Sequence, residues 1–279
     1  MDVLHGSVED LPFSDGIFDK AVTVESFYFW PNPAENLKEV ARILRPGGAA
    51  LSAAMLSHAG LAGADVVELA PGLGRTAAEI IKDRPASYTA IDRDPDAARR
   101  VAAVVGTLGT VRQGEAADTG LDEASADVVV GEAMLTMQGD KGKAAIVAEA
   151  ARVLRSGGRY AIHELGVAPD DIDEEYYTRL RRDLARAIHV NARPMTAAAW
   201  RALMEDAGLE VDWVGTAPMA LLKMSRNLRD EGLGGSMRMV RNVLGDKELR
   251  ARIRQMRSVF ARYEKEMVGI ALVARKPED

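Results

Sequence analysis

The 279-residue sequence predicts an α/β protein with a seven-stranded, mostly parallel sheet, helices on both faces and a helical insertion before the last strand. Two observations predict this class. Across residues 61–167, apolar runs of strand length alternate with helical segments, which is the pattern of a parallel sheet covered on both sides. Beyond them, two helical segments and two strand-like runs follow, and a long segment separates the last two strands.

The core elements follow one another in a regular order. Short apolar runs predict strands at 65–69, 87–91, 127–130 and 159–163, and helices are expected between them at 76–82, 94–105 and 141–154. Acidic residues open the second helix, where the helix dipole favours negative charge. The Gly157–Gly158 pair is expected to end the third helix and to turn the chain into the next strand.

The carboxyl-terminal part of the chain adds helices at 173–188 and 196–207 and strands at 209–214 and 267–274. Thr196 is the expected N-cap of the second helix, and Gly208 its stop. Residues 216–266 are rich in Met and in basic side chains, and they form a segment far longer than an ordinary connection. We expect this segment to be a helical lid or insertion, or else a contact between subunits.

The amino-terminal segment repeats part of the core. Residues 6–48 match residues 114–158, including the Gly-Gly pair at the end of each, but the first copy has no counterpart of the front half of the core. We therefore predict a partial repeat, a strand plus a helix, over 1–50 and a complete domain over 51–279. The alternative is that the aromatic run at 27–30 lines the entrance to a substrate site.

Composition and charge disfavour several classes of protein. Without Cys there is no disulfide or thiolate nucleophile, and four His without paired spacing predict no metal site. A formal net charge of −6 argues against nucleic acid as the main partner. The chain start does not resemble a signal peptide, and no apolar run reaches the ~18–20 residues of a membrane-spanning helix. We expect a cytoplasmic protein that binds neither membrane nor nucleic acid.

The most informative segment is the glycine-rich turn Glu68-Leu-Ala-Pro-Gly72-Leu-Gly74, which follows the first core strand. Glycine lets a ligand approach the backbone closely, and Asp92 at the end of the next strand can accept hydrogen bonds from ribose hydroxyls. Read as G-x-G-x-x-A, the turn suits a dinucleotide such as NAD. Read as an acid followed by small residues at alternating positions, it suits a nucleoside with an amino-acid tail. The glycine pattern alone leaves both alternatives open.

Several motifs together resemble the class I S-adenosylmethionine-dependent methyltransferases, across residues 50–279. Residues 68–74 resemble the family's first motif, E/D-x-G-x-G-x-G, with Ala70 in place of the first glycine. Residues 114–116 resemble a Gly-Asp-Ala segment, and 127–132 resemble the fourth strand and its functional tip. The amino-terminal half-copy is similar to methyltransferase type 11-like enzymes of quinone biosynthesis and other small molecules, but it lacks a first motif.

The resemblance implies a Rossmann-like fold that binds S-adenosyl-L-methionine. The residues it places at the cofactor are Glu68, Ala70, Gly72, Gly74, Asp92, Arg93, Glu115, Ala116 and Glu132. In this family the acid at the position of Asp92 binds the ribose hydroxyls, and the acid at the position of Glu115 meets the adenine amino group. Glu68 is expected to face the sulfonium and amino end, directly or through water.

Glu132 and His163 are the candidate catalytic residues. Glu132 ends the fourth core strand, where it could touch the acceptor or the sulfonium end, and His163 could act as a general base. The alternatives are a solvated turn acid and a structural histidine. The expected function is in-line methyl transfer to a small-molecule acceptor, by a protein that could form a homodimer. An NAD-type oxidoreductase and a non-catalytic S-adenosylmethionine-binding or assembly module stay open as alternatives.

Overall fold

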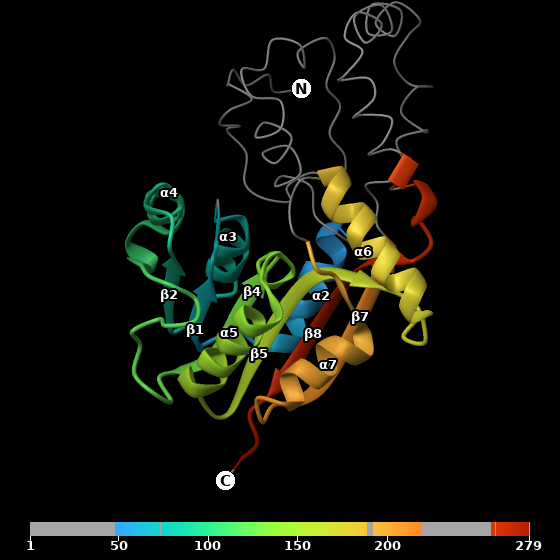
Figure 1. Cartoon of the computed structure of the whole chain (residues 1–279). Helices are drawn as coiled ribbons and strands as arrows, with labels where there is room; N and C mark the ends of the chain where they lie inside the picture. The colour runs from blue at the N-terminus through green and yellow to red at the C-terminus, as the bar shows by residue number, and fades with distance from the viewer. Residues whose placement is uncertain (1–47, 73, 189–191, 219–257, 260, 279) are drawn as a thin grey trace, which may run out of the picture.

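The computed structural model describes residues 48–72, 74–188, 192–218, 258, 259 and 261–278. The predicted partial repeat over 1–50 lies almost entirely outside these residues, as does most of the lid predicted over 216–266. Both stay predictions. In the described part of the chain a central sheet carries helices on either side (Figure 1).

The sheet of the described residues has the strand order β3-β2-β1-β4-β5-β8-β7. Its strands are β1 (Asp65–Leu69), β2 (Ser87–Asp92), β3 (Thr110–Gln113), β4 (Ala126–Glu132), β5 (Leu154–Val167), β7 (Glu210–Pro218) and β8 (Met267–Arg275), and the two-residue β6 (Met195–Thr196) pairs with the end of β5. Strands β1 to β5 are parallel, and β8 runs antiparallel between β5 and β7. The predicted α/β class with a mostly parallel sheet is confirmed.

The strand order places the candidate site. From β1 the chain moves outward to β2 and β3 on one side, and it then crosses to β4 and β5 on the other. In such open sheets, ligands bind outside the carboxyl ends of the strands at the point where the order reverses. Here that point lies between the end of β1 at Leu69 and the end of β4 at Glu132.

Helices cover both faces of the sheet. The first face carries α2 (Gly48–Ala59), α3 (Arg75–Lys82) and α4 (Pro95–Val105), the second carries α5 (Asp140–Val153) and α7 (Ala197–Glu205), and α6 (Glu174–Ile188) forms a third apolar cluster with the end of β5. Successive residues of a strand point to opposite faces, so Val130 contacts the first layer and Val129 the second. Buried on both sides, the central strands are almost continuously apolar.

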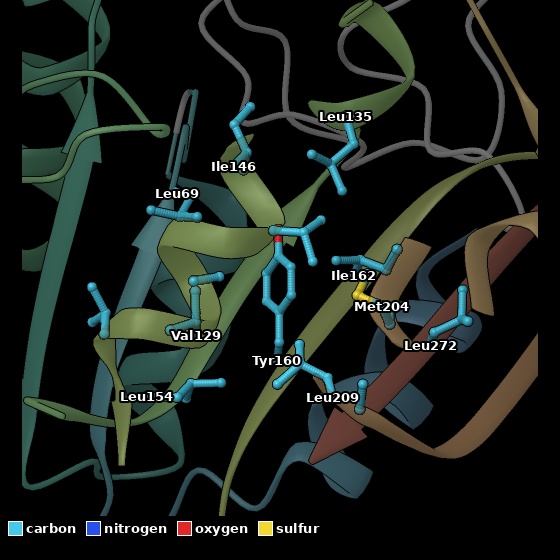
Figure 2. Close-up of a cluster of buried hydrophobic side chains, with 14 of the residues drawn as sticks. Leu69, Val129, Leu135, Ile146, Leu154, Tyr160, Ile162, Met204, Leu209 and Leu272 are labelled. Carbon is cyan, nitrogen blue, oxygen red and sulfur yellow. The ribbon is translucent and has the colours of Figure 1, made fainter. Parts of the chain in front are cut away.

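The core between the sheet and the α5–α7 layer is built around β5 (Figure 2). Tyr160 and Ile162 of β5 are fully buried there, together with Met204 and Trp200 of α7. Burial of a side chain of this size contributes about 1.5–3 kcal/mol relative to an exposed one. This core holds β4 and β5 side by side and so fixes the carboxyl ends of both strands.

Two elements differ from the sequence expectation. The apolar pattern of the sequence predicts no strand at β3, because its four residues Thr-Val-Arg-Gln are mostly exposed and form no apolar run at the edge of the sheet. Helix α5 ends at Val153, before the glycine pair, and β5 begins at once and runs through Gly158. A Cβ on Gly158 would lie 2.9 Å from the carbonyl oxygens of Arg155 and Asp127, so glycine is required there for close strand approach.

The predicted N-cap of α7 is confirmed, since Thr196 accepts a hydrogen bond from the Ala199 N–H at 3.2 Å.

A buried lysine lies between α5 and α7. Lys143 is 1% exposed, donates from Nζ to the Arg193 carbonyl oxygen at 2.7 Å and sits 5.0 Å above the Trp200 ring. Burial lowers the pKa of Lys143 from 10.5 to about 8, while the charge of Asp140 opposes that shift. Lys143 is therefore still largely charged at neutral pH, in surroundings that disfavour the charge.

Stability is therefore expected to rise with pH because of Lys143. Between about pH 8 and 10.5 the unfolded chain binds this proton more fully than the folded chain does, so raising the pH favours folding. Lys143→Met should raise the free energy of unfolding by about 1–2 kcal/mol at pH 7, with a smaller gain at pH 10. Urea unfolding at both pH values measures this, with the exposed Lys141→Met as the control. A less stable Lys143→Met protein at pH 7 would contradict the expectation.

Candidate functional site

The glycine-rich turn between β1 and α3 has an unusual backbone. Ala70, Gly72 and Gly74 have φ angles of 51°, 60° and 78°, so left-handed residues occur at every second position. Glycine adopts this conformation freely, whereas a side chain with a Cβ is strained in it. The small residues that the sequence places at these positions are therefore required by the shape of the turn, and Ala70 is held in a strained conformation.

Asp92 lies directly beside this turn. Its carboxylate is 7% exposed; Oδ2 accepts a hydrogen bond from the Gly72 N–H at 3.3 Å, and Oδ1 accepts one from the Asp94 N–H at 2.9 Å. Burial raises the pKa of Asp92, and the two N–H donors oppose that rise. Each carboxylate oxygen can accept a further hydrogen bond, so the group can still bind hydroxyls of a ligand.

Glu68 is directed into the sheet. It is buried on β1, and its Oε2 accepts a hydrogen bond from the Tyr88 hydroxyl of β2 at 2.5 Å. Burial raises the pKa of Tyr88, and the negative charge of Glu68 raises it further. The phenol therefore stays neutral and can donate its hydrogen bond to Glu68. The sequence does not predict this hydrogen bond, because Tyr88 comes next to Glu68 only through the pairing of β1 with β2. That Glu68 faces the sulfonium end stays a prediction.

The loop after β3 carries Glu115 and Ala116 to the same edge of the sheet. Gly114, which opens the loop, donates its N–H to the Asp92 carbonyl oxygen at 3.0 Å. Glu115 is exposed, and Ala116 packs partly against the core. Arg93 is exposed as well, and its carbonyl oxygen accepts a hydrogen bond from Gln113 Nε2 at 3.2 Å. Asp92 and Glu115, the two carboxylates predicted to bind the nucleoside, therefore both lie at the carboxyl ends of the neighbouring strands β2 and β3.

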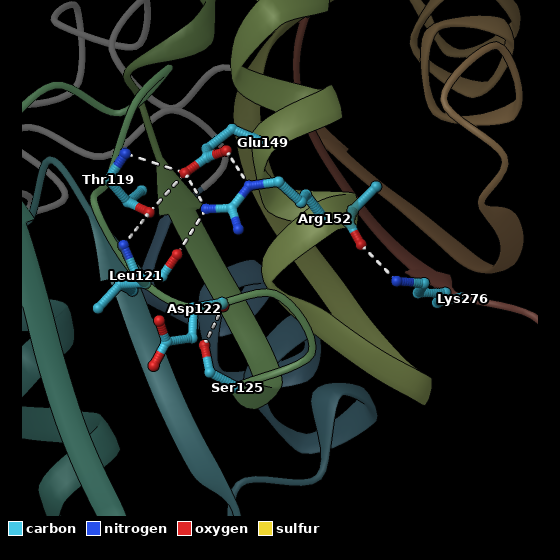
Figure 3. A network of polar contacts seen from close by, with 8 residues as sticks. Thr119, Leu121, Asp122, Ser125, Glu149, Arg152 and Lys276 are labelled. Atoms are coloured by element: carbon cyan, nitrogen blue, oxygen red, sulfur yellow. Dashed lines mark hydrogen bonds and ion pairs between the residues drawn. The ribbon is translucent and has the colours of Figure 1, made fainter.

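A polar network anchors the far end of that loop to α5 (Figure 3). Glu149 Oε1 accepts hydrogen bonds from Thr119 N–H at 2.9 Å and from its hydroxyl at 2.5 Å, and Arg152 donates to both Glu149 and the Leu121 carbonyl oxygen. The Arg152 guanidinium, with the Thr119 donors, lowers the pKa of Glu149 to about 2. Because a pKa this low keeps Glu149 ionised at physiological pH, its hydrogen bonds to the loop that bears Glu115 do not depend on pH in that range.

Glu132 and His163 meet at the carboxyl end of β4. They are paired in register on neighbouring strands, and His163 Nδ1 lies 3.0 Å from Glu132 Oε1. Ser52 of α2 donates to the same Oε1 at 2.8 Å, and Thr76 of α3 donates to Oε2 at 2.6 Å. Ser52 Oγ also lies 2.7 Å from His163 Nδ1. We call these four residues the Glu132 cluster.

The contacts of the Glu132 cluster exclude one of the two interpretations of Glu132 that the sequence left open. Glu132 is nearly buried and held by several donors, so it is no solvated turn acid. Thr76 lies in the first turn of α3, directly after the glycine-rich turn, and so connects the cluster to the nucleoside side of the site. Sequence reasoning missed Ser52 and Thr76, because a single hydroxyl on a helix carries no pattern that predicts a partner 80 or 56 residues away.

The backbone just after Glu132 is fixed by a second buried acid. Glu164 accepts hydrogen bonds from the N–H groups of Met134, Leu135 and Thr136 at 2.7–3.0 Å and from the Thr136 hydroxyl at 2.6 Å. Burial raises the pKa of Glu164, and these donors oppose the rise. Glu164 points to the face opposite His163, so it holds the chain beyond β4 in place and stays outside the Glu132 cluster.

Other features of the described residues place no site elsewhere. A cavity of about 300 Å³, bordered by Leu56, Ser57, Gly60, Leu61, Ala62 and Asp83, lies at the amino-terminal edge of β1, where parallel sheets do not bind their ligands. Within the described ranges no three His, Asp or Glu side chains are grouped as metal ligands. None of the helices described here is both long and apolar enough to cross a membrane.

The turn geometry predicts the effect of a Cβ at Gly74. An alanine there would be strained by its φ of 78°, and its Cβ would lie 3.3 Å from Val104 Cγ2 and 3.4 Å from the Val101 Cα. Gly74→Ala should lower the free energy of unfolding by about 2 kcal/mol and weaken nucleoside binding. Gly63→Ala is the matched control, because Gly63 has a φ of 70° with nothing within 4 Å. It should cost about 1 kcal/mol and leave binding unchanged. Equal effects of both changes on binding would contradict the role of the turn.

Comparison with known proteins matches the chain to one family model. The model is described as a methyltransferase domain, and it matches residues 1–52 and 67–162, together more than half of the chain. A protein of Haemophilus influenzae, described as uncharacterized, is 26% identical over 239 residues, which cover 84% of this chain and 93% of the relative.

Solved structures share the fold at low sequence identity. The geranyl diphosphate C-methyltransferase from Streptomyces coelicolor A3(2), solved with Mg²⁺, geranyl diphosphate and S-adenosyl-L-homocysteine, aligns with a TM-score of 0.59 at 16% identity, over 88% of this chain and 84% of that one. The [4+2]-cyclase SpnF aligns with a TM-score of 0.59 at 16% identity, over 82% of this chain and 81% of that one. The fold is thus shared by proteins named for different reactions.

Proposed function

Since the chain belongs to the methyltransferase domain family, we propose that it uses S-adenosyl-L-methionine to methylate a small-molecule acceptor. One observation carries the proposal: the Asp92 carboxylate lies beside the left-handed turn at 70–74, at the point where the strand order reverses. A ribose held by Asp92 and an amino-acid tail lying over the turn would fill this place together. S-Adenosyl-L-homocysteine, bound in the Streptomyces coelicolor neighbour, has the same parts.

The residues at this edge fit such a cofactor by their chemistry. From the described residues, Asp92 Oδ2 accepts one hydrogen bond, the long 3.3 Å bond from the Gly72 N–H, so it can also accept a ribose hydroxyl. Glu115 is exposed at the start of the loop after β3, where it can accept from an adenine amino group. Ala70, Gly72 and Gly74 keep the turn free of bulky side chains. The cofactor, when bound, supplies a methyl group already activated by its sulfonium.

The chain's own residues then have three tasks, which are to bind, to orient and to exclude water. Asp92, Arg93, Glu115 and Ala116 belong to the nucleoside end of the proposed site. Glu68 and the turn belong to its amino-acid end, and Glu132 lies on the acceptor side. Met137, half exposed just beyond β4, offers an apolar surface to an acceptor. A net charge of −6 supports a small-molecule partner over nucleic acid, and a homodimer is part of the same proposal.

Two measurements on the full chain test the proposal. Calorimetric titration should show S-adenosyl-L-homocysteine binding and no comparable binding of NAD. Transfer of a labelled methyl group to members of a small-molecule panel should then form S-adenosyl-L-homocysteine. Tight binding of NAD alone would support the oxidoreductase alternative. Binding of S-adenosyl-L-homocysteine with no transfer would support the non-catalytic module, an outcome that matters because the SpnF neighbour shows that the fold alone does not fix the reaction.

A further inference from the structure

The hydrogen bonds of the Glu132 cluster determine which nitrogen of His163 carries the proton. A carboxylate accepts only, so the Ser52 hydroxyl donates to Glu132 Oε1 at 2.8 Å. His163 Nδ1 then faces oxygen lone pairs on both sides, from Ser52 at 2.7 Å and from Glu132 at 3.0 Å. Two acceptors so close would repel each other, so Nδ1 must be the protonated nitrogen. In a neutral imidazole Nε2 then keeps its lone pair.

Among the residues that the structure describes, that lone pair has no partner. His163 is 1% exposed, and Nε2 is buried without a hydrogen bond from any residue that the structure describes. A buried acceptor left unpaired is energetically costly, and native proteins keep few of them. The opposite nitrogen, by contrast, has two oxygen neighbours. The unsatisfied atom is thus the one that a ligand proton would complete.

The arrangement has the parts of a general base. An acid behind Nδ1 fixes the tautomer of the ring and stabilises the imidazolium that forms when Nε2 takes up a proton. Ser52 of α2 contacts both the ring and the acid, and it so fixes the distance between them. Glu132 ends β4 and His163 is its register partner on β5, so the ring lies level with the end of β4, on the acceptor side of the proposed site.

We propose that the acceptor of this enzyme is a hydroxyl compound, whose proton His163 Nε2 removes, and that Glu132 and Ser52 are positioning residues for His163. This inference rests on the proposed function and deepens it by naming the acceptor class. A neutral hydroxyl oxygen is a weak nucleophile that needs a base, whereas the lone pair of an unprotonated amine and the π bond of an alkene can attack before any proton is removed.

The step balances without a further reactant. The acceptor O–H bond breaks, and its proton goes to Nε2, giving an imidazolium beside Glu132. The acceptor oxygen uses the electron pair of that bond to form the new oxygen–carbon bond to the methyl group. The carbon–sulfur bond breaks at the same time, and its pair stays on sulfur as a neutral thioether. The imidazolium afterwards releases its proton to water, which restores the base.

The first test needs no acceptor. A long-range ¹H–¹⁵N correlation spectrum of the full chain, saturated with S-adenosyl-L-homocysteine at pH 8, reports the protonation of each imidazole nitrogen. His163→Gln identifies the His163 signals among those of the four histidines. We expect Nδ1 protonated and Nε2 unprotonated, and we expect Glu132→Gln, whose amide can accept from or donate to Nδ1, to give a mixture of tautomers. Nε2 protonated with Nδ1 free would overturn the proposal.

The second test separates proton removal from structure. Phenol, a phenol that is largely ionised at pH 8 such as 4-nitrophenol, the amine sarcosine and the alkene geranyl diphosphate are each offered at pH 8 with labelled S-adenosyl-L-methionine. His163→Gln should lower kcat for phenol by about 10²–10⁴-fold and spare the ionised phenol, because the latter has no proton to lose. Loss of folding or of cofactor affinity would lower both rates together. The matched control is His58→Gln, an exposed histidine stacked on Trp213, which should change neither rate.

The outcomes distinguish this inference from the proposed function. Failure of the wild-type chain to bind S-adenosyl-L-homocysteine contradicts the function itself. Binding followed by transfer only to sarcosine or geranyl diphosphate keeps the function and overturns the inference, and so does binding without transfer to any hydroxyl compound. Equal loss of rate for phenol and 4-nitrophenol in a folded His163→Gln protein also overturns it. Transfer to hydroxyl oxygen with selective loss for phenol supports it.

Discussion

Asp92→Ala is expected to weaken binding of S-adenosyl-L-homocysteine about 10- to 100-fold. The change removes the acceptor for the ribose hydroxyls and leaves the Gly72 N–H, now 3.3 Å from Oδ2, without its carboxylate. Unpaired polar groups of this kind cost about 1–3 kcal/mol, and about 1.4 kcal/mol corresponds to a tenfold change in affinity. Calorimetric titration of the variant against the wild-type chain measures the loss directly.

Two companion variants make the Asp92 result specific. Asp92→Asn keeps one acceptor oxygen and the size of the side chain, so its loss should be smaller than that of alanine. Asp96 lies four residues further along the chain, in the exposed first turn of α4. Asp96→Ala should leave the dissociation constant within about twofold of wild type. An unchanged dissociation constant for a folded Asp92→Ala protein would remove Asp92 from the site.

Glu132→Ala is expected to lower the free energy of unfolding by about 3–5 kcal/mol. It deprives Ser52, Thr76 and His163 of a shared partner, and the sum of several lost hydrogen bonds and a small cavity reaches this size. The cluster connects helices α2 and α3 to strands β4 and β5, so its loss weakens the packing of both helices on the sheet. Urea unfolding followed by circular dichroism measures the change.

The isosteric variant separates charge from shape at this position. Glu132→Gln retains an oxygen that can accept from one hydroxyl, so it should cost about 1–2 kcal/mol. Glu174→Ala, an exposed acid in the first turn of α6, should shift stability by no more than about 0.5 kcal/mol. If Glu132→Ala proves as harmless as Glu174→Ala, the four residues do not form a buried network in solution.

Much of the fold could be predicted from the sequence because the central strands are covered on both faces. Their continuous apolar runs identified β1, β2 and β4, and the glycine spacing placed Asp92 beside Gly72 across twenty residues. The edge strand β3 could not be predicted, because its side chains are mostly exposed and its residues form no apolar pattern. An edge strand gains its structure from its neighbour β2 rather than from its own composition.

The chemistry of the strand ends could be predicted only in part. The sequence predicts that Glu132 and His163 each end a strand, which is confirmed for Glu132 and wrong for His163, because β5 continues to Val167. Their contact depends on the register between β4 and β5, which a single sequence does not fix. The Tyr88 partner of Glu68 and the Ser52 partner of Glu132 depend on pairing across β1–β2 and on how α2 packs. Tertiary contacts of this kind leave no local spacing to recognise.

A structure of the full chain with S-adenosyl-L-homocysteine bound tests the central claim most directly. We predict the ribose hydroxyls against the Asp92 carboxylate and the amino-acid tail over the turn at 70–74, with the sulfur toward Glu132. Adenosine bound away from Asp92, or a turn filled by the protein's own side chains with no room for the nucleoside, would contradict the account.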